Sequence, residues 1–275
     1  MSVMSTPIPA TIKPMTNFSF RQEGEVQLLV CEPLERLGFK NAFSTRLGGV
    51  SPLPANALSL GNFSHDERAN VIENRRRFLA ALNSDDWPLV TAKQIHSADI
   101  RTVADVEDAL GDSQPGDALT ANLAGIFLAI QTADCMPVLI ADQRTRAFAA
   151  IHAGWRGTVA GVAGAAVTAL GALGAQPGQL RAVLGPSIGP CCFEVQADVA
   201  AEFARVVPGS VQQRGGRTYV DLWQTNRELL LQAGLAPAHI DAAPPCTHCD
   251  PRRFYSYRRD GAGIGQHLAF ILGGS

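Results

Sequence analysis

Three side chains that can bind a metal, or act as a nucleophile and a base, lie at the ends of apolar segments. Cys135 opens one short apolar run, His152 closes the next, and His96 follows the run at 87–94. Strands hold side chains more rigidly than loops do, so strand ends can aim them into one cleft. Two imidazoles and one thiolate suit zinc, and three protein ligands leave the fourth tetrahedral position open, as catalytic sites require. The pattern therefore predicts a catalytic metal site.

The same residues allow two other interpretations. Cys135 could be a nucleophile with His96 or His152 as its base, which would give a metal-free hydrolase of amides or esters. A non-catalytic metal-binding module would need a fourth protein ligand, and the sequence offers no obvious one. The separations match no short zinc motif, so each histidine alone could equally be a packing or capping residue.

Apolar runs around these residues predict a mixed sheet. The runs at 125–133, 136–142 and 146–152 are nearly continuous, which is typical of strands covered on at least one face. Strands and helices alternate irregularly, which favours an α+β architecture over a doubly wound parallel sheet. No linker divides the chain, so we expect a flexible N-terminal tail over 1–20 and one domain over 21–275.

Two segments have clear helical signals. The glycine- and alanine-rich run at 157–173 predicts a helix that can lie close to a sheet. Ser64 and Glu67 form a capping box, which predicts the start of a helix over 64–83. The arginine triplet at 75–77 is expected to face solvent for the most part.

Composition excludes several classes of protein. The 275 residues are 46% hydrophobic and 17% charged with a net charge of −2, so there is no basic footprint for nucleic acid or an anionic membrane. No apolar run reaches the ~18 residues of a membrane span, and the N-terminus does not resemble a signal peptide. Six cysteines without a secretory signal indicate reduced thiols. We therefore expect a cytoplasmic monomer or small homo-oligomer whose ligands are small molecules.

Seven sequence blocks, in order, identify a family resemblance. They are "FSTRLGGVS" (43–51), "QIHS" (94–97), "GDALTA" (116–121), "TADCMPVLIAD" (132–142), "IHAGWRGTVAG" (151–161), "LGPSIGPCCFEV" (184–195) and "CTHCDPRRFYSYRRDG" (246–261). From about residue 40 to its end, the chain resembles the bacterial laccase-domain family, also called polyphenol oxidase or peptidoglycan-editing-factor proteins. The resemblance implies a four-layer α/β/β/α sandwich, with His96, Cys135 and His152 as the metal ligands.

The resemblance also implies an activity. Members of this family are understood as zinc-dependent purine nucleoside phosphorylases with adenosine deaminase activity. Phosphorolysis would split adenosine, inosine or methylthioadenosine into free base and ribose 1-phosphate or its methylthio analogue. Hydrolytic deamination would convert adenosine to inosine. The sequence offers no evident general acid or base for either reaction.

Neighbouring residues suggest how substrate would bind. Arg46, at a strand end before two glycines, and Arg156, at a predicted helix start, are candidate phosphate or ribose ligands because a guanidinium presents a planar set of donors. Asp134 is expected to support the structure next to Cys135. Three residues are candidates for the rim of the site: Ser256, Tyr257 and Arg258.

Copper and cell-wall chemistry are the alternatives that the family names raise. A blue-copper centre uses two histidines, a cysteine and a weak axial methionine, and Met136 follows Cys135. A laccase adds a three-copper cluster that needs more histidines than the six in this chain. Copper could still occupy a zinc site, because copper(II) binds such ligands more tightly. The name peptidoglycan-editing factor suggests hydrolysis of cell-wall precursors instead.

Four further cysteines form no complete motif. The segment "PPCTHC" (244–249) is half of the zinc nucleobase-deaminase signature, but the chain lacks the accompanying H-x-E. A structural zinc site is conceivable, although adjacent cysteines rarely both bind one ion. Its ligands would be Cys191, Cys192, Cys246 and Cys249.

Overall fold

The computed structural model describes residues 17–53, 56–61, 66–83, 87–242 and 244–273. Its largest features are two six-stranded mixed sheets. The first contains, in spatial order, β1 (Phe18–Glu23), β2 (Val26–Cys31), β3 (Lys40–Ser44), β15 (His267–Leu272), β8 (Phe127–Thr132) and β5 (Leu89–Thr91). The second contains β14 (Ile240–Asp241), β11 (Arg181–Leu184), β9 (Met136–Ala141), β10 (Phe148–Ala153), β7 (Ala118–Ala121) and β6 (Ile100–Thr102). Most neighbours are antiparallel, whereas β5–β8, β6–β7 and β11–β14 are parallel.

Helices surround the sheets; some cover their outer faces, and others add buried side chains to the core between them. They are α1 (Glu32–Arg36), α2 (Arg68–Ala80), α3 (Val106–Leu110), α4 (Trp155–Val159), α5 (Val162–Ala172), α6 (Ala197–Val206), α7 (Leu222–Gln232) and α8 (Tyr257–Asp260), with short 3₁₀ turns at Pro177–Gln179, Pro208–Ser210 and Pro237–His239. A small ribbon of β12 (Val211–Arg214) and β13 (Arg217–Val220) lies beside α6, and β4 (Leu47–Ser51) lies beside α2. The predicted mixed-sheet α+β class is confirmed.

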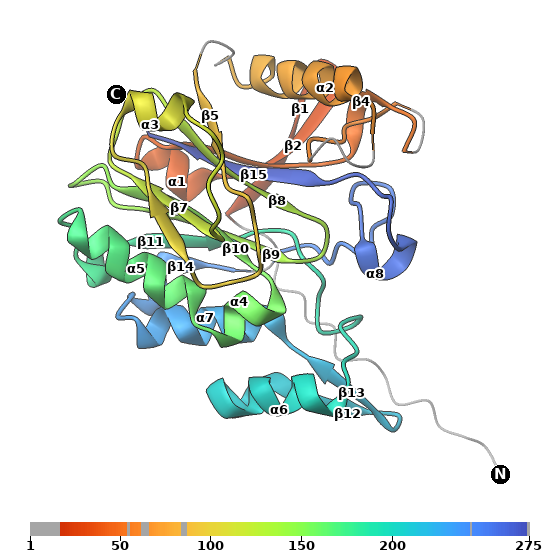
Figure 1. Cartoon of the computed structure of the whole chain (residues 1–275). Coiled ribbons are helices and arrows are strands. Elements are labelled where there is room, and N and C mark those ends of the chain that lie inside the picture. The colour runs from red at the N-terminus through yellow and green to blue at the C-terminus, as the bar shows by residue number, and fades with distance from the viewer. Residues whose placement is uncertain (1–16, 54–55, 62–65, 84–86, 243, 274–275) are drawn as a thin grey trace.

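Three hydrophobic clusters show how the helices and sheets are stacked. On the first sheet, Phe78 of α2 packs edge-on against Phe270. Between the sheets, residues such as Leu128 and Phe148 are fully buried. Beyond the second sheet, the alanine-rich face of α5 packs with α7 against β10 and its neighbours. Figure 1 shows the resulting sequence of helix, sheet, sheet and helices.

Three predicted boundaries were wrong. Phe18 pairs with Cys31, so residues 18–20 of the expected tail belong to β1. The helix predicted at 157–173 is two helices, because Gly161 has a left-handed φ of 84° that ends α4. Glu67 is the N-cap of α2 and not its third residue, so the helix starts later than the capping box indicated; Ser64 lies outside the described residues.

The connection that matters for the site runs between the sheets. β8 belongs to the first sheet and β9 to the second, so residues 133–135 cross from one to the other. Such a crossing places its side chains at the end of both sheets, where β8 ends and β9 begins. In the described part of the chain, no helix is long and apolar enough to cross a membrane.

Candidate metal centre and cavity

Cys135 and His152 meet as the sequence predicts. Cys135 lies immediately before β9, and the β9–β10 register pairs His152 with Pro137 and Ala153 with Met136. The thiol therefore lies beside the end of β10. Its turn is tight, since the preceding Asp134 has a left-handed φ of 88°.

His96 reaches the same place from a loop. The strand expected over 87–94 is shorter, because β5 ends at Thr91. His96 follows in a left-handed conformation, with φ of 61°, and its ring lies 4.9 Å from that of His152 at an angle of 83°. The ligand atoms of His96, Cys135 and His152 all lie within 4.8 Å of one another. These three residues are called the Cys–His–His cluster below.

Asp117, directly before β7, organises two members of the cluster. Its fully buried carboxylate accepts a hydrogen bond from Nδ1 of His152 at 2.7 Å. It also accepts the backbone N–H groups of Ile95, His96 and Ser97 at 2.7–3.1 Å. Holding Nδ1–H in this way leaves Nε2 of His152 as the free ligand atom, which is the usual role of a carboxylate behind a metal-binding histidine.

Sequence reasoning missed Asp117 as a site residue. The signal that could have found it is an acid directly before the buried strand "ALTA", one of the family-like blocks. An acid at such a position is costly to bury unless it is paired, so it implies a partner in the site.

Electrostatics favour a deprotonated sulfur. Burial opposes the thiolate of Cys135, but the positive charge and hydrogen bonds of His152, with a hydrogen bond from His96, lower its pKa to about 6. Burial likewise disfavours protonated His152, but Cys135 and Asp117 raise its pKa to about 9. Burial opposes the Asp117 carboxylate too, but hydrogen bonds from His152 and Ser97 lower its pKa to about 2. The cluster thus presents a thiolate, which is the form that binds metals.

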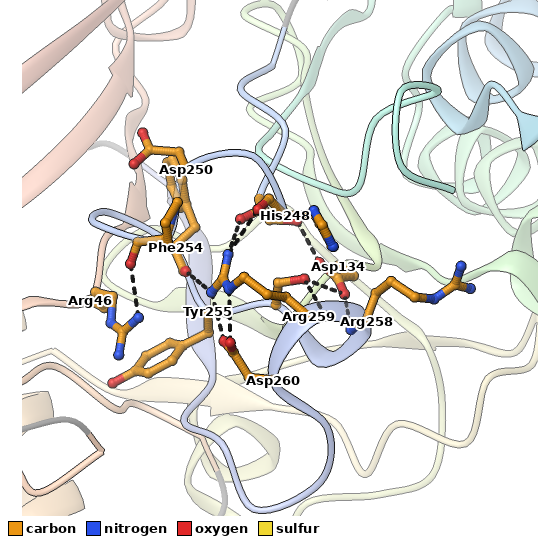
Figure 2. Close-up of polar contacts among 12 residues, drawn as sticks. Arg46, Asp134, His248, Asp250, Phe254, Tyr255, Arg258, Arg259 and Asp260 are labelled. Atoms are coloured by element: carbon orange, nitrogen blue, oxygen red, sulfur yellow. Dashed lines mark hydrogen bonds and ion pairs between the residues drawn. The ribbon is translucent and has the colours of Figure 1, made fainter. Parts of the chain in front are cut away.

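Asp134 anchors the Cys135 turn to the C-terminal segment. Its buried carboxylate accepts hydrogen bonds from Thr247 Oγ1 at 2.6 Å, Ser256 Oγ at 3.0 Å and the backbone N–H of Arg258 at 2.7 Å. Figure 2 shows Asp134 beside Arg258 in this network. The expected structural role of Asp134 agrees with these contacts, and Ser256 is buried behind the rim rather than on it.

The cluster opens into a cavity of about 970 Å³. Arg156, Tyr257 and Arg258 line it, as does Trp155, over whose ring the Arg156 guanidinium lies at 4.2 Å. The volume is that of a pocket for a drug-sized ligand. Arg75 also lines the cavity, although the sequence suggested that its triplet mostly faces solvent.

Arg46 lies elsewhere. Among the described residues that line the cavity Arg46 does not appear. Its guanidinium donates to the carbonyls of Pro251 at 2.9 Å and Leu53 at 3.3 Å and lies over the Tyr255 ring, as Figure 2 shows for Tyr255. These contacts hold loops together and commit donors that a phosphate would need.

Gly154 leaves room for the Cys–His–His cluster. A Cβ built on it would lie 3.1 Å from Cys135 Sγ and 3.1 Å from His96 Cδ2. Its φ of −65° is allowed for alanine, so the Gly154→Ala substitution would press on the side chains of the cluster without backbone strain. We expect metal affinity to fall about 10-fold or more, as for other changes that displace ligands. Competition with a chelator measures this.

Gly164→Ala is the matched control. This glycine of α5 has open space around its would-be Cβ, so the substitution should leave metal affinity unchanged. Equal affinity in both variants would contradict the placement of Gly154 against the ligands.

Comparisons with known proteins agree on one family. Residues 40–273 match the family model described as multi-copper polyphenol oxidoreductase laccase. A purine nucleoside phosphorylase of Deinococcus radiodurans is 39% identical over 86% of this chain and 89% of its own length. The adenosine deaminase RL5 of an unknown prokaryotic organism is 32% identical over 86% of this chain and 98% of its own. The crystal structure of YlmD from Geobacillus stearothermophilus has a TM-score of 0.86 at 32% identity, covering 93% and 99% of the two chains.

Proposed function

The chain belongs to the multi-copper polyphenol oxidoreductase laccase family, and from this premise we propose that it is a metal-dependent enzyme of purine nucleosides. Relatives named purine nucleoside phosphorylase and adenosine deaminase support this class of substrate. The observation that carries the proposal is the Cys–His–His cluster at the wall of a cavity large enough for a nucleoside.

Zinc is the metal that the donors suit best. A thiolate and two imidazoles form a ligand set of borderline softness, and His152 is already oriented through Asp117. Bound at three protein ligands, zinc would act as a Lewis acid and lower the pKa of water at its open position to about 7. His96, Cys135 and His152 would hold it.

Copper could bind at the Cys–His–His cluster, but the described residues do not form a multi-copper site. Among the described residues, the two groups able to hold an ion contain no histidine besides His96 and His152. His267 is used elsewhere, since its ring accepts the backbone N–H of Tyr255 at 2.8 Å. A four-copper oxidase therefore lacks its ligands in the described part of this chain.

The cavity residues would bind the substrate. Arg156 lines the cavity and would bind phosphate for phosphorolysis of adenosine, inosine or methylthioadenosine. Arg75 and Arg258 add positive charge to the cavity, although their guanidinium groups already donate to backbone carbonyls. Trp155 and Phe193 offer apolar surface for the base. Arg46, the other candidate phosphate ligand, does not line the cavity, so we assign this role to Arg156. Deamination of adenosine would use the same metal.

The Cys–His hydrolase is the second candidate, and one observation favours it. Cys135 and His152 form a thiolate–imidazolium pair even without a metal, because their pKa values of about 6 and about 9 bracket neutral pH. Such pairs activate cysteine nucleophiles. The hydrolase would act on amide bonds or peptidoglycan precursors.

Product analysis separates the candidates. Protein purified without a metal-affinity tag should carry zinc and convert adenosine to inosine, or, when phosphate is present, to adenine and ribose 1-phosphate. Stripping the metal with a chelator should abolish both reactions, and zinc should restore them. Turnover that survives chelation would reject the metal enzyme. Restoration by copper alone, with oxidation of phenols, would favour the oxidoreductase.

Thiol alkylation supplies an independent check with a defined pH dependence. In metal-free protein the Cys135 thiolate persists down to pH about 6, and below that pH the alkylation rate by iodoacetamide should fall about tenfold per unit. Bound zinc should protect Cys135, as peptide mass spectrometry would reveal. Equal labelling with and without zinc would show that Cys135 is not a ligand.

A further inference from the structure

Four cysteines that the proposed activity does not use come together at a second place. They lie in two segments far apart in the sequence, and their sulfur atoms are all within 4.8 Å of one another. We propose that they bind one structural zinc ion. The four residues, called the cysteine quartet, are Cys191, Cys192, Cys246 and Cys249.

The sulfur distances are those of a metal site. Cys249 Sγ lies 3.6 Å from Cys191 Sγ and 3.4 Å from Cys192 Sγ. A disulfide would bring two sulfurs to ~2.0 Å. Four sulfurs around zinc at about 2.3 Å form a tetrahedron with edges of roughly 3.8 Å. The observed separations are close to that edge, and a set this compact suits one ion.

The adjacent pair does not prevent this geometry, although the sequence argued against it. Cys191 and Cys192 lie in a tight turn, in which the N–H groups of Cys192 and Phe193 both donate to the carbonyl of Gly189 at 3.0 Å. Consecutive side chains of a helical turn point about 100° apart, whereas in a strand they point to opposite faces. Both sulfurs can therefore face the same point.

The second segment is organised without the ion. Cys246 and Cys249 have the C-x-x-C spacing of zinc sites. The Arg259 guanidinium donates to the carbonyls of Thr247 at 2.9 Å and His248 at 3.1 Å, which holds this turn in shape (Figure 2). Backbone hydrogen bonds then join the two segments, from Thr247 N–H to the Ser187 carbonyl at 3.0 Å.

The backbone at Gly189 lies close enough to the second segment to contact one of the sulfur atoms. The N–H of Gly189 donates to Cys246 Sγ at 3.2 Å, the kind of contact that stabilises a thiolate ligand. A Cβ on Gly189 would lie 2.8 Å from the Trp223 ring and 3.2 Å from Cys246 Cβ, so a larger residue would push the two segments apart. Cys191 and Cys249 are exposed, which gives an ion access from solvent.

The zinc would cross-link segments that form the wall of the cavity. Ile188 and Phe193 flank the first pair of cysteines and line the cavity. Thr247, between the second pair, donates to Asp134 next to Cys135. The ion would thus stabilise the support of the Cys–His–His cluster without touching the substrate.

Zinc analysis on single variants tests the proposal. The wild type should carry two zinc ions per chain, one at each group. Cys135→Ala should keep the ion of the quartet, and Cys249→Ser should lose it while keeping the other. Cys31→Ala, at the sixth cysteine, which is buried in the core, is the control and should keep both.

X-ray absorption on the Cys135→Ala variant makes the test independent of the folding of the quartet variants. Its remaining zinc should have only sulfur neighbours, at about 2.3 Å. Absence of zinc from this variant, iron in its place, or a disulfide within the quartet in anaerobically purified protein would overturn the proposal. These results do not depend on activity, so failure of the purine nucleoside proposal would leave them interpretable.

Discussion

Replacement of Cys135 by alanine should remove the metal from the Cys–His–His cluster and lower kcat/KM for adenosine roughly 10³-fold or more. Metal polarisation supplies several kcal/mol of transition-state stabilisation, and each 1.4 kcal/mol corresponds to about a tenfold change in rate. The two histidines that remain would bind zinc weakly, since Asp117 holds His152 but nothing replaces the sulfur. Steady-state kinetics and metal content on the same sample measure both losses.

Cys135→Asp distinguishes a ligand from a nucleophile. Aspartate is an acceptable zinc ligand, so this variant should retain metal and part of the activity if Cys135 binds the ion. A hydrolase that forms a thioester would lose its nucleophile and stay inactive. Cys31→Ala serves as the cysteine control, because Cys31 is buried in the core between the sheets. A Cys135→Ala variant whose kcat/KM stays within tenfold of the wild-type value would contradict both mechanisms.

The Cys135 and His152 positions could be predicted because they depend on local pattern. Two consecutive apolar runs joined by the polar turn 142–146 pair as antiparallel neighbours, and their far ends must then meet. His96 is grouped with them because it also follows an apolar run and can bind a metal, and the resemblance implies the same three residues. In the structure His96 lies in a loop after the three-residue strand β5, and its own backbone is left-handed. No repeating pattern of apolar residues in the sequence indicates such a loop conformation.

Arg46 shows why ligands of substrate are harder to predict. A guanidinium after a strand is chemically able to bind phosphate, but the backbone carbonyls of Leu53 and Pro251 compete for its donors. Pro251 is far from Arg46 in the sequence, so nothing local signals the competition. Arg75 is the opposite case. Its place in a charged triplet favoured a solvent-facing side chain, but in the structure it lines the cavity.

The cysteine quartet was discounted for a related reason. The objection to Cys191 and Cys192 was that adjacent cysteines rarely both bind one ion. The turn in which the N–H groups of Cys192 and Phe193 donate to the Gly189 carbonyl answers it, because neighbouring side chains of a helical turn can face one point. The proposed zinc site therefore depends on a turn that the spacing of the cysteines alone does not reveal.

Asp117→Asn should lower metal affinity about 10- to 100-fold and kcat/KM by roughly 10² to 10⁴. The carboxylate accepts the backbone N–H groups at 95–97 and Nδ1–H of His152, whereas asparagine has one oxygen and an amide that donates. If the amide faces His152, the proton of the imidazole moves to Nε2 and blocks the ligand atom. ¹⁵N NMR of the histidine ring measures that tautomer directly.

Stability should fall as well, by about 3 kcal/mol, because charge-assisted hydrogen bonds to a buried carboxylate are lost. The folded pKa of Asp117 is about 2, below its unfolded value of ~3.9, so its contribution is complete above pH ~4 and disappears as pH falls towards 2. The gap in unfolding free energy between wild type and the asparagine variant should therefore narrow over that window. Denaturant titrations at several pH values measure it.

Asp142→Asn separates positioning from general destabilisation. Asp142 is equally buried and accepts hydrogen bonds from Thr145 Oγ1 at 2.8 Å and Arg144 N–H at 3.0 Å, at the turn opposite the site. Its variant should lose stability but keep wild-type metal affinity and histidine tautomer. If the two variants lost metal affinity equally, Asp117 would act only through the fold. If Asp117→Asn alone weakened binding while both were destabilised, the buried carboxylate would be the residue that fixes His152 and the 95–97 loop around the metal.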